Sequence, residues 1–310
     1  MNPREEKPSS RFAAALAVIG ASMLFGTTGT AQALGPRTTT PVGVGAVRLA
    51  VGAATLAAVA YARRPPGGRR WRPHLVPLLV GGLAVAAYHV LWFAGLRRTG
   101  VALGTIVGIG SGPVFAGLIH LVLARTKLSR SWTLGTALTV AGAALLGTRG
   151  AGGLSVDPLG LACVLGSGLG YAVYAEGAKR AIAAGLDPPG AMAGVCVVAS
   201  VLTIPVLVFE PMGWLLTPRG AALGLHLGVV TLGLGYTLYG WALNHLKVPT
   251  AVTLTLAEPL TAALLGMAFL GERLGKEGWI GVALIAAGLV LAGRGDADAG
   301  AATEGLPIAP

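Results

Sequence analysis

Apolar runs of nearly constant length recur along the whole chain and dominate its pattern. Each is close to the roughly 20 residues that an α-helix needs to cross a bilayer, and short polar or basic stretches separate them. The pattern predicts spanning helices at residues 12–33, 41–61, 74–96, 100–123, 131–148, 158–178, 189–209, 220–243, 249–270 and 277–293. The fold class that follows is an all-α polytopic membrane protein of about ten transmembrane helices.

The composition agrees with a bilayer as the solvent. Of 310 residues, 54% are hydrophobic and 11% are charged, whereas soluble domains carry about 25% charged residues. The connections are too short to hold a second, soluble domain. We therefore divide the chain into an N-terminal segment at 1–11, two helical halves at 12–149 and 156–293, and a tail at 294–310 that we expect to be disordered.

The distribution of basic residues predicts the orientation. The net charge of +11 is concentrated in short stretches between apolar runs, and the largest group is Arg63, Arg64, Arg69, Arg70 and Arg72. Clusters of this kind mark cytoplasmic loops, which argues against a nucleic-acid partner. We expect a multi-pass protein of the cell (inner or plasma) membrane with both termini cytoplasmic.

The two halves resemble each other at a nearly constant offset. Gly112-Pro113 and Glu258-Pro259 lie 146 residues apart, and the same offset aligns Gly135 with Gly281 and Gly142 with Gly288. At an offset of 148, Tyr88 aligns with Tyr236. The chain is therefore interpreted as two five-helix units. Because five is odd, the second unit enters the membrane from the opposite face, and such inverted repeats support alternating access around a central site.

Glu258 is the leading candidate for chemistry, because a carboxyl group deep in lipid is costly unless a cavity or a partner receives it. In a continuous helix Thr255 and Thr261 share its face. Pro259 clashes with the carbonyl group four residues earlier, which frees the Thr255 carbonyl. The group could bind a cationic or hydroxylated substrate or carry a proton, and a purely structural glutamate is the alternative.

The first half has a corresponding break at Gly112 and Pro113 without a charge. Gly112 also belongs to a series of small residues spaced for helix packing, so packing is the alternative role. Arg48, inside the second span, either extends to the headgroups or pairs with a carboxylate or an anionic substrate.

Aromatic residues with polar tips occur in the third and eighth spans: Tyr88, His89, Trp92, Tyr236 and Tyr239. They line a cavity for an amphipathic ligand or serve as packing. Four tryptophans fall at segment ends, where a belt at the membrane interface is the favoured interpretation: Trp71, Trp132, Trp214 and Trp279. The sequence contains no metal-ligand spacing and no cofactor motif, so we expect no metal and no cofactor.

The second half carries motifs of a known family. The run Ala257-Glu258-Pro259-Leu260, followed by Leu270-Gly271-Glu272-Arg273-Leu274 and Trp279-Ile280-Gly281, resembles the second-repeat signature of EamA-type transporters of the drug/metabolite transporter superfamily. The resemblance covers roughly residues 12–293. It implies two EamA repeats, cytoplasmic termini and export or exchange of small metabolites such as amino acids. One departure is Thr126, which stands where the second repeat has Glu272.

The leading functional hypothesis is a secondary transporter that exports or exchanges an amino acid-like or amphipathic metabolite by alternating access. Its partners are the substrate and the bilayer, and protons are a candidate coupling ion through Glu258. The alternatives are an intramembrane lipid-modifying enzyme, for which no HExxH or GxSxG motif is present, and a membrane assembly partner without transport activity.

Overall fold

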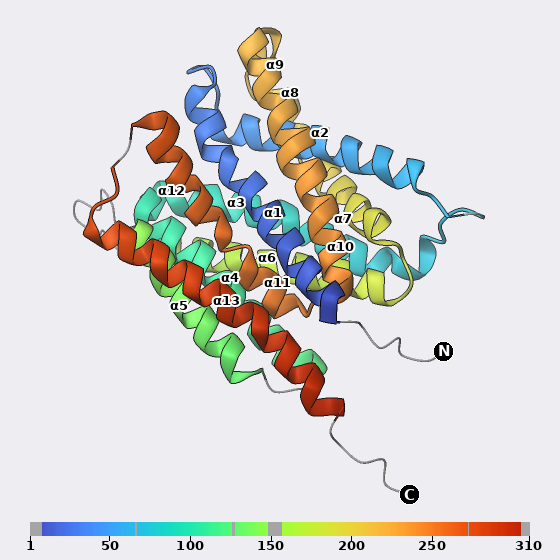
Figure 1. Ribbon diagram of the computed structural model, residues 1–310. Coiled ribbons are helices and arrows are strands. Elements are labelled where there is room, and N and C mark those ends of the chain that lie inside the picture. The colour runs from blue at the N-terminus through green and yellow to red at the C-terminus, as the bar shows by residue number, and fades with distance from the viewer. Residues whose placement is uncertain (1–7, 66, 126–127, 148–156, 272, 305–310) are drawn as a thin grey trace, which may run out of the picture.

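The protein is built from packed helices (Figure 1). A computed structural model describes residues 8–65, 67–125, 128–147, 157–271 and 273–304, and every regular element in these ranges is a helix. Thr126 and Glu272, the aligned positions at which the two repeats differ, lie outside the described residues. The first half contains α1 (Pro8–Leu34), α2 (Pro41–Ala62), the short η1 (Arg72–His74), α3 (Leu75–Thr99), α4 (Val101–Ala124) and α5 (Arg130–Gly147).

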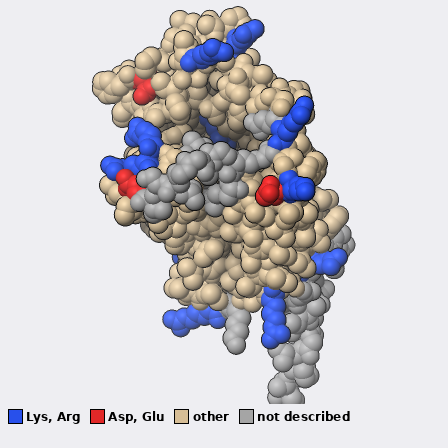
Figure 2. All heavy atoms as spheres, turned by 90° about the vertical axis from the view of Figure 1, so that its left-hand side faces the viewer, with Lys and Arg blue, Asp and Glu red and all other residues tan. Residues whose placement is uncertain are grey.

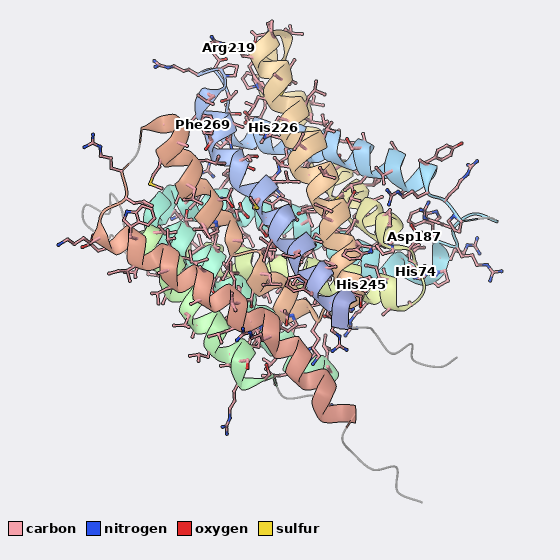
Figure 3. The ribbon with its side chains drawn as sticks, in the orientation of Figure 1. His74, Asp187, Arg219, His226, His245 and Phe269 are labelled. Atoms are coloured by element: carbon pink, nitrogen blue, oxygen red, sulfur yellow. The ribbon has the colours of Figure 1, made fainter. Side chains whose placement is uncertain are left out.

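The second half has more interruptions. It contains α6 (Pro158–Ala183), α7 (Pro188–Leu202), α8 (Ile204–Phe209), η2 (Gly213–Leu216), α9 (Pro218–Leu225), the π-helix η3 (His226–Leu234), α10 (Gly235–His245), α11 (Val248–Leu254), α12 (Ala257–Leu270) and α13 (Lys276–Glu304). The elements α9, η3 and α10 form one continuous span. His226 opens the π-helix (Figure 3), and its Nε2 lies 2.9 Å from the hydroxyl group of Thr27 on α1.

One capping motif starts several of these helices. A Thr or Asp precedes Pro at the first helical position, and its side-chain oxygen accepts a hydrogen bond from the amide of the glycine three residues later. This cap begins α2 at Thr40, α6 at Asp157, α7 at Asp187 and α9 at Thr217, with donor–acceptor distances of 2.9–3.2 Å. The cap gives a hydrogen-bond partner to an amide of the first turn that has none within the helix, and the proline fixes its φ angle near the helical value. The bond from the Gly160 amide also lowers the pKa of Asp157.

Within the described residues, eight helices are long and apolar enough to cross a membrane. They are Ser10–Leu34, Pro41–Ala62, Arg72–Thr99, Leu103–Ala124, Pro158–Ala183, Pro218–His245, Val248–Leu270 and Lys276–Arg294. The other two expected spans correspond to α5 and to α7 with α8. The latter is interrupted at Thr203, whose hydroxyl group bonds back to the Ser200 carbonyl, just before Pro205. The count of ten is thus not established by length and hydropathy.

The contact between α5 and α13 relates the two halves. A Cβ on Gly142 would lie 2.6 Å from the carbonyl oxygen of Gly281, and a Cβ on Gly288 would lie 2.6 Å from that of Gly135. As the residue number rises on one helix it falls on the other, so the helices run antiparallel. The glycines aligned by the internal repeat therefore face one another crosswise, which is the contact expected about a local two-fold axis.

The helix ends gather at two opposite sides. In Figure 1 the connection between α2 and α3 lies at the right, the first turns of α1 lie just right of the centre, and the last turns of α13 lie at the lower right of the bundle. The start of α9 lies at the top, and the end of α12 lies at the upper left. The five arginines between Arg63 and Arg72 thus belong to the side that also carries the start of α1.

Two further expectations need correction. The segment from Arg294 is helical as far as Glu304, because α13 continues through an alanine-rich stretch that ends before Pro307, while residues 305–310 lie outside the described part. Trp132 and Trp214 do not line an outer belt. They are 7% and 3% exposed, since Trp132 packs over Gly117 and Trp214 packs within a cluster that includes Leu227.

Candidate functional site

A cavity of about 270 Å³ lies between the two halves. Helices α1, α2, α3 and α4 line it from the first half, and α6, η3, α10, α11 and α12 line it from the second. Gln32 in the last turn of α1 and Pro41 in the first turn of α2 belong to its wall, so it extends toward the end of the molecule where these helices meet. Figure 2 looks onto this side and shows a hollow with basic atoms at its depth.

Two side chains of opposite charge line this cavity, Arg48 from α2 and Glu258 from α12. The Arg48 Nε atom is buried and has no hydrogen-bond partner among the described residues. Neither residue forms an ion pair within the described part of the chain, although the two side chains interact electrostatically. An unpartnered guanidinium nitrogen and a separate carboxylate in one cavity form a site with two opposite charges available to a ligand.

A break in the ninth predicted span positions Glu258. Helix α11 ends at Leu254, and α12 begins at Ala257. Glu258 is therefore in the first turn of α12, where the helix dipole favours a carboxylate. The Thr255 carbonyl accepts a hydrogen bond from the Glu258 amide at 2.9 Å, so the expectation of a freed Thr255 carbonyl is wrong.

The predicted common face of Thr255, Glu258 and Thr261 is interrupted by this break. Thr255 lines the cavity beside Glu258. Thr261 does not, because it packs on α1, where a Cβ on Gly26 would come within 2.7 Å of its own Cβ. Its hydroxyl group donates to the Ala257 carbonyl at 3.0 Å. The predicted common face required one continuous helix from Thr255 to Thr261. The turn at residues 255–256 interrupts the helix, so the spacing no longer places the three side chains on one face.

The predicted helix breaks also differ from expectation. Gly112 and Pro113 line the cavity, but α4 runs through them from Val101 to Ala124 without ending. Pro259 is not part of the cavity wall. It occupies the first turn of α12, where a missing amide hydrogen costs little. In the described residues the helix that carries Glu258 is therefore interrupted beside the cavity, whereas α4, its counterpart in the first half, is continuous.

Aromatic rings form much of the cavity wall. Tyr88, His89, Trp92 and Tyr236 line it as predicted candidates. Tyr239 does not, because it is fully buried behind the wall with a hydroxyl group that has no partner among the described residues.

The sequence analysis missed Phe25 and Tyr171, which also line the cavity. Phe25 meets Tyr236 edge to face at 5.7 Å, and Tyr171 meets Tyr88 in the same way at 6.2 Å. Tyr171 follows Phe25 by 146 residues, so the repeat offset could have identified this pair.

Glycines in the wall fall into two kinds. A Cβ on Gly108 would lie 2.5 Å from the Trp92 ring, and one on Gly168 would lie 2.0 Å from the Ser111 hydroxyl oxygen, so close packing requires both glycines. A Cβ on Gly45 or Gly112 would meet its nearest neighbours at 3.6–3.7 Å, which is ordinary contact. Packing does not explain these two glycines, and their absent side chains leave space in the cavity.

No group of three His, Cys, Asp or Glu side chains in the described part of the chain is arranged to hold a metal ion. The wall offers one guanidinium group, one carboxyl group, hydroxyl groups and aromatic rings. This donor set suits a small organic molecule with both charges.

A chain with several membrane-spanning helices and a cavity lined by charged and aromatic side chains between two related halves has the architecture of a membrane transporter. The comparison with known proteins identifies the family. Residues 12–148 and 158–294 each match the EamA-like transporter family, so the chain belongs to it and contains two EamA repeats.

Several relatives carry more specific names. The chain is 35% identical over 277 residues to "Uncharacterized transporter YwfM" of Bacillus subtilis, covering 89% of this chain and 92% of that protein. It is 31% identical to the "Threonine/homoserine exporter RhtA" of Escherichia coli, covering 81% and 79%. It is 27% identical to the "Probable terminal-alkyne amino-acid exporter" of Streptantibioticus cattleyicolor, covering 81% and 85%. A crystal structure with 22% identity matches with a TM-score of 0.76 over 91% of this chain and 96% of its own, which shows a shared fold.

Proposed function

We propose that this protein is a secondary transporter that exports a small zwitterionic metabolite of the α-amino acid class. The observation that carries the proposal is the single cavity in which Arg48 and Glu258 present opposite charges without pairing. The names of the threonine/homoserine and amino-acid exporters among its relatives support the same class and direction.

The chemistry of the cavity fits both ends of an amino acid. The Arg48 guanidinium group suits an α-carboxylate, because it donates two parallel hydrogen bonds in a fixed geometry. The Glu258 carboxylate accepts from an ammonium group, and Thr255 beside it supplies a hydroxyl group. Buried charges are costly unless they are paired, so a zwitterion stabilises both protein groups at once.

The aromatic side chains define the remaining space. Tyr88, Trp92 and Tyr236 form an apolar wall with polar tips for the substrate side chain, and His89 belongs to the same wall. The His89 Nδ1 atom lies 2.8 Å from the carbonyl oxygen of Val85 on its own helix. Because the carbonyl oxygen accepts, Nδ1 is the donor in this contact, and in the neutral ring Nε2 is left as an acceptor for the substrate.

We place the protein in the cell membrane with ten spans and both termini cytoplasmic. The arginines of the α2–α3 connection, at the end where α1 starts and α13 finishes, support this orientation. The ten spans comprise the eight long apolar helices together with α5 and the α7–α8 pair.

The crosswise glycine contacts of α5 and α13 support two inverted halves. Exchange of conformation between the halves would open the cavity alternately to each side. Glu258 is then also the candidate group for proton coupling.

The test is substrate efflux from proteoliposomes loaded with radiolabelled threonine. Glu258→Gln and Arg48→Gln should each reduce the initial rate at least about tenfold, since removing one partner of a buried charged contact costs about 2–5 kcal/mol. The matched control is Glu176→Gln, because Glu176 bonds Arg180 outside the cavity. N-acetylthreonine and threonine methyl ester, each lacking one charge, should compete poorly. Unchanged efflux in both cavity variants would refute the proposed site.

Proton coupling has a separate test. An imposed pH gradient should accelerate efflux in the unaltered protein and have no effect on the residual efflux of Glu258→Gln. A variant that responds fully to the gradient would exclude Glu258 as the coupling group while leaving substrate binding untouched.

A further inference from the structure

A second cavity of about 520 Å³ lies away from the substrate site, between α2, α3 and α7. It is at the end of the molecule that carries the α2–α3 connection, where Figure 3 labels His74 and Asp187. The wall is mainly apolar, and its charged members are Arg64 and Arg69. None of its lining residues belongs to the first cavity.

Small residues create this groove. Its wall includes Ala57 and Ala60 on α2 and Ala193 and Gly194 on α7. On its open side the wall includes Leu79, which is 52% exposed. In a membrane-spanning bundle such a groove opens to the lipid chains and offers them a recess rather than a convex surface.

The rim of the groove is strongly basic. Arg64 lines the groove, and Arg63, Arg70 and Arg72 neighbour its lining residues Arg64, Arg69 and Trp71 in the sequence. All four are exposed, and none forms an ion pair with a described residue. The segment from 63 to 72 contains no Asp or Glu. The guanidinium carbon of Arg64 lies 4.3 Å above the centre of the Tyr61 ring, a contact that holds the charge at the mouth. Trp71, also in the wall, is typical of a headgroup-level position.

Asp187, the acidic side chain that pairs with a wall residue of the groove, is already neutralised. Arg69 donates from Nη2 and Nε to the two carboxylate oxygens of Asp187 at 2.7 and 2.5 Å, and from Nη1 to the Ala60 carbonyl. The side chain of Arg69 is only 6% exposed. This bidentate pair joins the α2–α3 connection to the start of α7, and it leaves the rim arginines without a competing anion in the described structure.

We propose that the groove is a binding site for an anionic phospholipid, such as phosphatidylglycerol, of the leaflet that faces the α2–α3 connection. The phosphate group contacts the rim arginines, and an acyl chain occupies the groove between Ala57 and Val197. A basic rim at the headgroup level together with an apolar recess between helices is the combination that such lipids recognise. The inference is independent of the substrate and of the transport direction.

The experiment is native mass spectrometry of the detergent-purified full chain titrated with phosphatidylglycerol and with phosphatidylcholine of identical acyl chains. We expect clear preference for the anionic lipid. A triple Gln variant at Arg64, Arg70 and Arg72 should weaken its binding by about fivefold for each arginine removed, on the order of a hundredfold in all. The matched control removes Arg37, Arg219 and Arg273, which are exposed and distant in sequence from the groove.

A groove-filling variant tests the apolar part separately. Ala57→Phe leaves the charge unchanged and inserts a ring at an exposed wall position, so it should reduce occupancy by phosphatidylglycerol at least about fivefold. Thermal unfolding in phosphatidylcholine confirms that each variant is folded. Equal affinity for the two lipids, or equal losses in the two triple variants, would overturn the proposal. An unaffected Ala57→Phe variant would also overturn it, because the arginines alone would then account for binding.

Discussion

The contact between α5 and α13 permits a quantitative prediction for Gly142→Ala. The new Cβ would lie 2.6 Å from the Gly281 carbonyl oxygen and 2.8 Å from the Ile285 amide nitrogen. Both neighbours are backbone atoms and cannot rotate away. Since ordinary contact of a Cβ with another heavy atom begins at 3.4 Å, the helices must separate by roughly 0.6–0.8 Å, which forfeits a quarter to a half of the dispersion attraction at that contact. We expect a loss of about 1–3 kcal/mol in the free energy of unfolding.

The assay is thermal unfolding of the purified protein, followed by tryptophan fluorescence in one detergent. Gly293→Ala on α13 is the matched control, because nothing lies within 4 Å of its added Cβ. Alanine favours a helix over glycine by about 0.5–1 kcal/mol, so the control should be neutral or more stable. Gly281→Ala, whose Cβ would lie 2.7 Å from the Gly142 carbonyl oxygen, should behave like Gly142→Ala. Equal melting temperatures for Gly142→Ala and Gly293→Ala would refute the close antiparallel packing.

Two further predictions concern the cavity and the tyrosines beside it. Gly112→Ala should fold normally, because its Cβ meets Tyr171 and Val252 at 3.7 Å, an ordinary contact distance. The added methyl group takes space in the cavity, so efflux of a bulky amino acid should fall at least about tenfold relative to threonine. An equal loss for both substrates would argue against a role of Gly112 in size selection. Tyr174→Phe should raise the melting temperature, because the Tyr174 hydroxyl group is buried without a partner in the described structure and such a group costs about 1–3 kcal/mol. A lower melting temperature would show that the hydroxyl group is bonded in the membrane.

Much of the helical organisation was predictable, because membrane spans depend on local hydropathy and length. The repeat was also visible, since glycines at a constant offset reflect close backbone contacts that tolerate no side chain. The contacts between the two repeats were not predictable from the sequence. The alignment matches Gly142 with Gly288, whereas in the structure Gly142 packs on Gly281. An alignment reports equivalence, and contact depends on how the two units dock.

The candidate site was predictable in its members but not in its geometry. Glu258 and Arg48 stand out because charge is rare in apolar runs, but sequence could not place α2 and α12 around one cavity. The turn before Glu258 was missed because Thr255 and Leu256 look helical, and the hydroxyl–carbonyl contact of Thr255 with Val252 appears only in three dimensions. Thr261 was wrongly predicted as a cavity residue because the prediction assumed a continuous helix through this turn.

The π-helix from His226 to Leu234 has a consequence for how the two units diverged after duplication. The capping residues Thr40 and Asp187 are 147 positions apart, whereas Tyr88 and Tyr236 are 148 apart, and Tyr236 follows the π-helix. A π-helix holds an additional residue per turn inside a span, bonding i to i+5. An insertion can therefore be absorbed within the membrane rather than in a loop, and Tyr236 still lines the same cavity as Tyr88. Two copies whose spans differ in length can in this way keep a common cavity.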